Sequence, residues 1–212
     1  MKKAMNKILA LSLIFIAQGV HAALVEPEMD VAHGTVRLGP DVQAALHAWK
    51  RGFKLYQPKD YIEPVRHSLA DHSQSLPMAV IGNFNGDGIA DIVLMGHAAG
   101  RQIIVLLNSN LAQEKYEVLE VANEPAVANP RKEKYTGPSG VYYGLTTHLS
   151  LLPARYFQTG STEKSNTGTE APANLNQPRD GFQIEVYLSA ATQTYMFDGK
   201  RVVVNTGPVK QR

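Results

Sequence analysis

Cysteine is absent from all 212 residues of this sequence, and tryptophan occurs only once. The lack of cysteine excludes disulfide bonds, thiolate catalysis, metal ligation by thiolates and lipid attachment at a cysteine. The folded protein must therefore depend on its hydrophobic core alone. A chain of this length can bury a sufficient core within one domain.

An excess of either charge is lacking too, because 21 lysine and arginine residues oppose 19 aspartate and glutamate residues. Neither this balance nor any basic run indicates a nucleic-acid partner. The common catalytic signatures are also missing, since there is no G-x-S-x-G, H-E-x-x-H or G-x-x-x-x-G-K motif. These absences favour a protein that is not an enzyme, although scattered catalytic residues would leave no such motif.

Residues 1–22 have the organisation of a secretory signal peptide. Three lysines provide a positive start, residues 8–17 form an apolar run, and Val20-His21-Ala22 precedes a cut expected near Ala22/Ala23. The run is too short for a bilayer, which takes about 20 residues, although an uncleaved anchor helix is the alternative. No second run of spanning length follows. We therefore expect a periplasmic or secreted protein with no transmembrane segment after cleavage.

The remaining chain, residues 23–212, is predicted to form a single domain that is mainly β (α+β), with antiparallel meander sheets. An amphipathic stripe predicts a helix from Pro40, residues 61–69 suggest a short second helix, and residues 23–39 form an irregular or single-strand lead-in. Residues 159–180 are poor in large apolar side chains, which predicts a flexible loop. Strands are predicted at residues 78–82, 91–95, 102–108, 116–121, 142–152 (one strand or two), 182–188, 192–197 and 201–205.

Oxygen-bearing side chains recur at alternate positions between the first two of these strands, at Asn83, Asn85 and Asp87, followed by Asp91. Calcium takes six to eight oxygen ligands, and a loop can supply them from its first, third, fifth and ninth places. The backbone carbonyl of Ile89 occupies the seventh place, while glycines at 86 and 88 permit the tight turn. The spacing predicts a calcium site.

The stretch Asn83-Phe-Asn-Gly-Asp-Gly-Ile-Ala-Asp91, followed by Ile92-Val-Leu, resembles the FG-GAP or VCBS repeat. The resemblance implies one blade-like unit over residues 78–121 and calcium as the bound ion. A complete propeller is not expected, because no further copy of the motif occurs at a fixed period. Asn83 stands where the family usually has aspartate, so weak binding is expected, with a dissociation constant of about 10⁻⁴–10⁻³ M.

A simpler interpretation of the same residues remains open. Asn-Gly and Asp-Gly pairs are strong hairpin signals, and their side chains can bond only to their own backbone. The loop would then be a turn that holds no ion.

The main functional expectation is an exported, non-enzymatic protein whose calcium loop is structural and whose partner is an envelope protein or glycan. The alternative is a calcium-dependent periplasmic hydrolase with scattered catalytic residues. A cleft joining His97 or His148 to an acid and a serine would favour that alternative. A third possibility is an adhesion or assembly factor, which the resemblance also permits.

Overall fold

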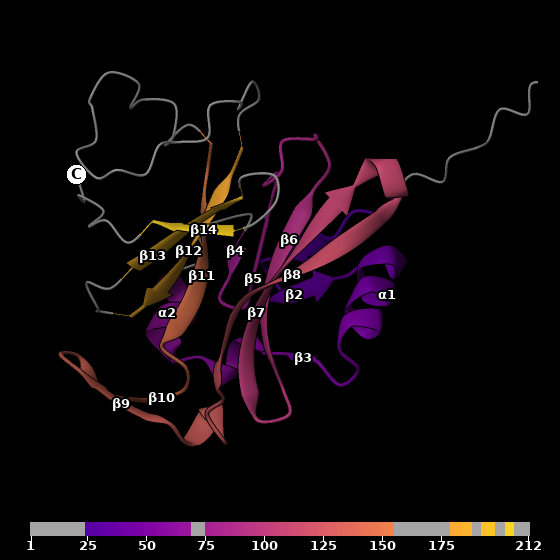
Figure 1. The fold of residues 1–212 in the computed structure, drawn as a ribbon. Helices are drawn as coiled ribbons and strands as arrows, with labels where there is room; N and C mark the ends of the chain where they lie inside the picture. Colours follow the sequence, from indigo (N-terminus) through magenta and orange to yellow (C-terminus); the bar gives the residue numbers. More distant parts are fainter. Residues whose placement is uncertain (1–23, 69–74, 155–178, 188–191, 198–201, 206–212) are drawn as a thin grey trace, which may run out of the picture.

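The computed structural model describes residues 24–68, 75–154, 179–187, 192–197 and 202–205 (Figure 1). These residues form a mainly β, antiparallel fold with two α-helices, and they do not close into a propeller. The fold class predicted from the sequence is therefore confirmed. The helices are α1 (Pro40–Trp49) and α2 (Glu63–Ser68), and the strands are β1 (Glu28–Asp30), β2 (Thr35–Arg37), β3 (Lys54–Leu55), β4 (Ser75–Leu76), β5 (Ala79–Gly82), β6 (Asp91–Ala98), β7 (Arg101–Asn110), β8 (Lys115–Pro125), β9 (Lys134–Gly137), β10 (Gly140–Tyr143), β11 (Thr147–Leu152), β12 (Gly181–Val186), β13 (Thr192–Phe197) and β14 (Val202–Asn205).

The main sheet has the strand order β4-β5-β6-β7-β8, and β3 pairs with the far end of β6. Each pair in this order is antiparallel, so the predicted meander is confirmed. Strands β6, β7 and β8 are longer than predicted, whereas β5 is one residue shorter. Side chains of β6 point alternately to two faces, as a pleated strand requires. Ile92 and Leu94 join one apolar cluster, whereas Val93 and Met95 join another. Both faces of the sheet are therefore covered.

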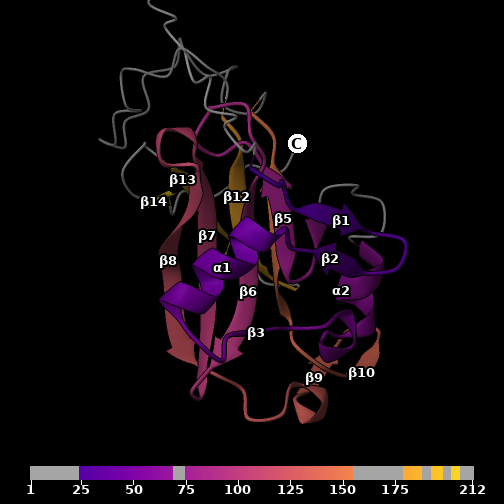
Figure 2. The same ribbon diagram turned by 90° about the vertical axis from the view of Figure 1, so that its right-hand side faces the viewer.

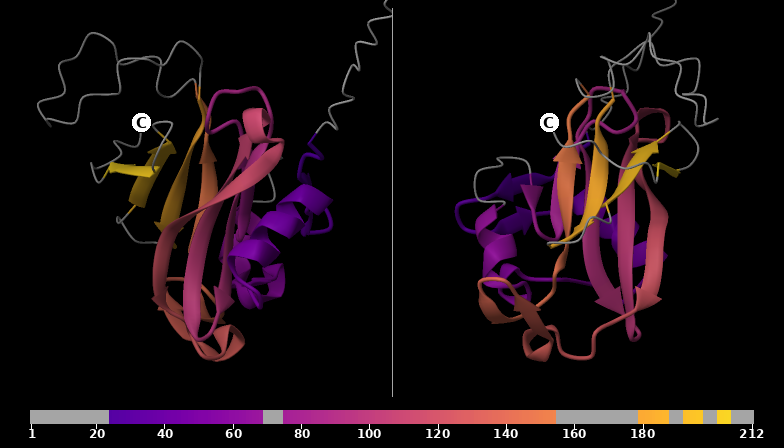
Figure 3. Two further views of the ribbon diagram at one scale, coloured as in Figure 1. Left: turned by 45° about the vertical axis from the view of Figure 1, so that its right-hand side comes forward. Right: turned by 90° about the vertical axis from the view of Figure 1, so that its left-hand side faces the viewer.

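A second sheet, with the order β11-β12-β13-β14, covers one face of the main sheet (Figure 3). Between the two sheets, Leu149, Phe182 and Tyr195 pack with Val93 and Leu106 in the larger cluster. The rings of Phe182 and Tyr195 are stacked, with centroids 5.1 Å apart. The sheets also meet at an edge, because the Leu149 amide donates to the carbonyl of Pro77.

Helix α1 covers the opposite face of the main sheet (Figure 2). Pro40 suits the first turn because its missing N–H would have no partner there. The helix buries Val42 and Leu46 against Leu94, Val105 and other residues of the smaller cluster. The predicted helix is confirmed, and the resulting order is helix, main sheet, second sheet.

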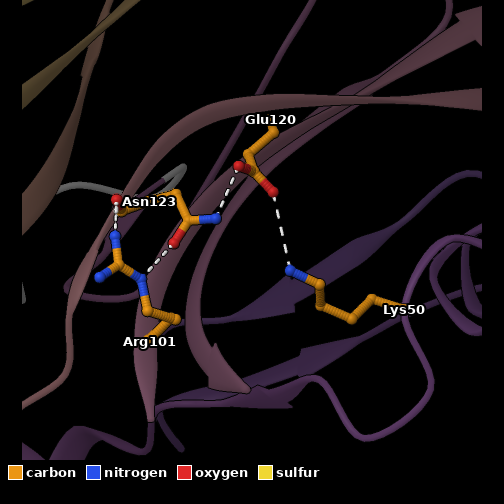
Figure 4. A network of polar contacts seen from close by, with 4 residues as sticks. All are labelled: Lys50, Arg101, Glu120 and Asn123. Carbon is orange, nitrogen blue, oxygen red and sulfur yellow. Dashed lines mark hydrogen bonds and ion pairs between the residues drawn. The ribbon is translucent and has the colours of Figure 1, made fainter. Parts of the chain in front are cut away.

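Polar contacts fasten the end of α1 to the edge strand β8 (Figure 4). Lys50 Nζ lies 3.7 Å from Glu120 Oε2, and Asn123 Nδ2 donates to Glu120 Oε1 over 2.8 Å. Arg101 Nε donates to Asn123 Oδ1 over 2.7 Å.

The β7–β8 register shifts by one residue between Ile104 and Val105. Charged side chains and such an irregularity both discourage another strand from adding to an exposed edge.

Two small hairpins lie outside the main layers. Strands β1 and β2 pair where the sequence suggested an irregular or single-strand lead-in, so that expectation was incomplete. Strands β9 and β10 pair around Pro138-Ser139. Neither hairpin was predicted as a pair, because strands this short show no periodic apolar pattern. The predicted strand region at residues 142–152 overlaps the end of β10 and contains β11.

Only the last two residues of the predicted flexible loop at residues 159–180 belong to the described part of the chain. These two residues, Arg179 and Asp180, are held by hydrogen bonds to other parts of the fold. Residues 159–178 lie outside the described part of the chain. The predicted signal peptide, residues 1–22, also lies outside it. Among the described residues, no helix has the length and apolar character needed to cross a membrane.

Candidate functional site

The predicted calcium loop connects β5 to β6, which are adjacent antiparallel strands of the main sheet. Gly86 and Gly88 have φ angles of 81° and 90°, which non-glycine residues rarely adopt. Phe84, which lies along the chain between β5 and these glycines, is buried, whereas Asp87 is exposed. The loop therefore has one apolar anchor and a polar outer part.

Three of the predicted ligands bond to amides of their own loop. Asn83 Oδ1 accepts from the Gly86 amide, Asn85 Oδ1 from the Asp87 amide and Asp87 Oδ1 from the Ile89 amide, each over 2.8 Å. A carbonyl or carboxylate oxygen has two lone pairs, so each of these atoms keeps one for a further partner. The arrangement is compatible with a turn and with a loop that holds a cation.

Asp91 differs from the other ligands because it is fully buried. Its Oδ2 accepts from the amides of Phe84 and Asn85 over 2.8 and 3.2 Å, and its Oδ1 accepts from the Ser109 amide over 2.7 Å. Burial raises the pKa of this carboxyl to about 6, while the hydrogen bonds from Ser109, Asn85 and Phe84 oppose that rise. Asp91 therefore shapes the loop and carries a charge in a dry environment.

Ser109, on β7, lies between the two carboxylates of the loop. Its Oγ is 2.8 Å from Asp87 Oδ2 and 2.7 Å from Asp91 Oδ1. The Asn85 amide nitrogen donates to the Ser109 carbonyl over 2.8 Å and approaches Oγ at 3.1 Å. A hydroxyl has one hydrogen, so it can donate to only one of the two carboxylates. The other contact leaves two oxygen atoms facing each other without a hydrogen between them, and a proton or a cation nearby would reduce that repulsion, while water can reach the exposed Asp87.

Several carboxylates surround the loop, together with the Arg179 guanidinium, whose Nε would lie 3.0 Å from a Cβ at Gly86. Tyr116 donates to the Ala90 carbonyl over 3.0 Å, and Glu26 Oε2 accepts from the Ala90 amide over 3.2 Å. The pKa of Tyr116 is raised, chiefly by burial and then by the charges of Asp91, Glu26, Asp41 and Asp87. Because these carboxylates disfavour another negative charge at the tyrosine, they favour a positive charge nearby.

The structure thus brings Asn83, Asn85, Asp87, Ile89 and Asp91 together in one loop, but it gives them different surroundings. Three amides and a shared hydroxyl occupy most of the lone pairs of Asp91, so its place as a direct ligand stays a prediction. Within the described residues, no three histidine, aspartate or glutamate side chains converge on one metal position. A cation here would rely on amide and carbonyl oxygens besides the carboxylates.

Four polar residues that contact the loop were not predicted from the sequence: Glu26, Ser109, Tyr116 and Asp180. Ser109 follows a long apolar run in a short polar segment, which was the one available signal. Glu26 and Asp180 lie far away along the chain, so no local spacing connects them with the loop.

The histidines proposed for a hydrolase do not form a nucleophile–base pair. His148 is 6 % exposed, and its Nε2 lies 3.8 Å from Glu185 Oε2. Ser150 Oγ donates to Glu185 Oε1, and among the contacts of the described residues no hydrogen bond joins it to the imidazole. His97 packs against Tyr56, with ring centroids 5.2 Å apart. A serine nucleophile requires direct contact with its base.

Comparison of the chain with protein-family models, with curated proteins and with solved structures gives no match. The resemblance to the FG-GAP or VCBS repeat therefore rests on the residues of the loop alone.

Proposed function

We propose that the loop at residues 83–91 binds a structural calcium ion in an exported protein whose role is recognition rather than catalysis. The observation that supports the ion best is the position of Ser109 Oγ, 2.8 Å from Asp87 Oδ2 and 2.7 Å from Asp91 Oδ1. One hydroxyl hydrogen cannot serve both carboxylates. A cation at the loop offsets the remaining charge.

Oxygen donors suit a hard cation such as calcium, and the loop offers carboxylate, carboxamide and main-chain oxygens. Asn83, Asn85 and Asp87 each retain a lone pair beyond the amide that they accept. Only Asp87 and Asp91 are anionic within the loop, which is consistent with binding in the range of about 10⁻⁴–10⁻³ M.

The ion's role on this proposal is to hold the β5–β6 turn. An ion that binds only the folded state stabilises the protein by RT ln(1 + [Ca²⁺]/Kd), which is about 1.4 kcal/mol at ten times Kd. For a domain of this size, that corresponds to a rise in Tm of roughly 3–6 °C.

The test is thermal unfolding of the expressed protein after chelation and during a calcium titration, beside Asp87→Ala. We expect calcium at millimolar concentration to raise the Tm of the wild type, magnesium to raise it less, and the variant not to respond. Asp30→Ala is the matched control, because Asp30 is also an acid that begins a tight connection, at the end of β1, where its Oδ2 lies 2.6 Å from His33 Nδ1. If calcium leaves the wild-type Tm unchanged, the loop is only a turn.

Recognition of an envelope protein or glycan is the second part of the proposal. On the β9–β10 hairpin, Val141 is 50 % exposed and Tyr143 is 59 % exposed. Alternate residues of a strand share a face, so these two side chains lie together. Tyrosine is enriched in binding interfaces, and its amphipathic ring suits both a protein surface and a sugar.

Immobilised protein, exposed to envelope extract with and without calcium, tests this part. We expect one specific partner that binds the wild type and is lost with Tyr143→Ser. Leu111→Ser provides the control, because Leu111 is 51 % exposed on a different part of the surface. Equal capture by all three proteins would contradict a recognition role for the hairpin.

The alternative, a calcium-dependent hydrolase, draws on the cluster of His148, Glu185 and Ser150. The contacts of that cluster count against it, because Glu185 receives the serine hydroxyl and also lies beside the imidazole. A hydrolase would lose turnover of ester or glycoside substrates on Ser150→Ala, whereas we expect no such turnover in the wild type.

A further inference from the structure

We propose that Asp180 couples cation binding at the loop to the docking of the second sheet on the main sheet. Asp180 is then a positioning residue for the ion site, although it lies 97 residues from Asn83. This inference rests on the calcium function proposed above, and it names a part of the molecule that the bound ion would control.

The carboxylate of Asp180 bridges three segments. Its Oδ2 accepts from the Asn83 amide over 2.9 Å, and its Oδ1 accepts from the Ala154 amide over 2.9 Å. The Asp180 amide donates in turn to the Asn83 carbonyl over 3.0 Å. Asp180 therefore joins the first place of the loop to the residues that follow β11 and precede β12.

Gly82, at the end of β5, and Gly86, in the loop, leave the space that this contact requires. A Cβ at Gly82 would lie 3.1 Å from Asp180 Oδ2, and a Cβ at Gly86 would lie 3.0 Å from Arg179 Nε. Arg179 also approaches the second sheet, where its Nη1 donates to the Phe197 carbonyl over 3.4 Å. The pair Arg179-Asp180 is thus seated directly against the loop.

An aromatic contact connects the loop with the second sheet independently of these polar groups. Phe84, from the second place of the loop, packs edge-on against Phe182 of β12, with ring centroids 5.6 Å apart. Both side chains are 1 % exposed. The loop contacts β7 of the main sheet through Ser109 and β12 of the second sheet through Phe84. Ordering of the loop by an ion would therefore restrict residues of both sheets.

Asp180 also supplies charge where the loop has little. Asn83 carries no charge at the first place, and the Asp180 carboxylate lies at its amide. An ion that orders Asn83 also fixes its backbone amide, which donates a hydrogen bond to Asp180 Oδ2. Asp180 immediately precedes β12, so the start of that strand is held in place as well. By linkage, docking of the second sheet favours ion binding to the same extent that the bound ion favours docking, and on this proposal Asp180 is the contact that transmits the coupling.

The experiment compares wild type, Asp180→Asn and Asp180→Glu, with Glu63→Gln on helix α2 as the matched control. Calcium affinity is measured by calorimetry, and amide hydrogen exchange is followed in β12 and in β6. We expect calcium to slow exchange in β12 of the wild type and of Glu63→Gln. Asp180→Asn should bind calcium about tenfold more weakly, since it loses hydrogen bonds to a charged acceptor, and its β12 should not respond. Asp180→Glu, which keeps the charge, should recover part of the affinity.

The outcomes separate this inference from the function on which it rests. If the wild type does not bind calcium, the proposed function fails and this inference fails with it. If the wild type binds calcium and Asp180→Asn binds equally, with the same slowing in β12, only the coupling through Asp180 is overturned. If Asp180→Asn does not fold, the test falls to the wild type. Calcium that slows hydrogen exchange in the loop of the wild type but not in β12 would contradict the coupling.

Discussion

Asp91 should make the stability of the calcium-free protein fall as the pH rises. Its carboxyl has a pKa of about 6 in the folded protein, against 3.8 for the ordinary group, chiefly because it is buried. The folded state therefore binds a proton more tightly than the unfolded state does between these values. Stability from this group is fully present below about pH 4 and is lost as the pH rises through about 6.

The size of this effect follows from the difference between the two pKa values. About two units at 1.36 kcal/mol each correspond to about 3 kcal/mol in full, of which about 2 kcal/mol falls between pH 4 and pH 7. The side chain is fully buried, so solvent does not screen the effect as it would at the surface. Saturating calcium should reduce the slope, since the ion favours the ionised carboxylate.

Urea unfolding in calcium-free buffer from pH 4 to 7, with wild type and Asp91→Asn, measures this effect. The amide of the variant does not titrate in this range, so the difference between the two proteins isolates Asp91 from the other acids. We expect the wild type to lose about 2 kcal/mol relative to the variant as the pH rises. A constant difference across the range would show that Asp91 stays ionised in the folded protein and would refute the reasoning.

Two further predictions concern the seating of the loop. Phe84→Ala should lower the free energy of unfolding by about 3–5 kcal/mol, because it leaves a cavity beside Phe182. Urea unfolding measures this loss, and a value below about 1 kcal/mol would contradict the prediction. Gly86→Ala should cost more than Gly88→Ala, although both have positive φ, because only the first new Cβ meets Arg179. If the two variants melt at the same temperature, the Arg179 contact is of no consequence.

Local patterns determined much of the fold. The stripe of Val42, Leu46 and Trp49 specified helix α1, and apolar runs between turn residues specified β5 to β8. These signals are read within a few residues, because helix and strand periodicities are short. The same reasoning placed five candidate ligands in one loop. The short strands β3 and β4 were missed, since two residues carry no period.

Tertiary structure alone decided what surrounds the loop. The sequence by itself specified the oxygen-bearing residues and the glycines that let the chain turn, because both depend on nearest neighbours. It did not reveal that Ser109 lies between Asp87 and Asp91, or that Asp180 reaches the amide of Asn83. Ser109 reaches the loop because β6 and β7 pair within the main sheet, whereas Asp180 reaches it because the second sheet packs on the main sheet. Burial in the folded protein raises the pKa of Asp91. The charge balance of the site is therefore a property of the packed layers, whereas its ligand types are a property of the chain.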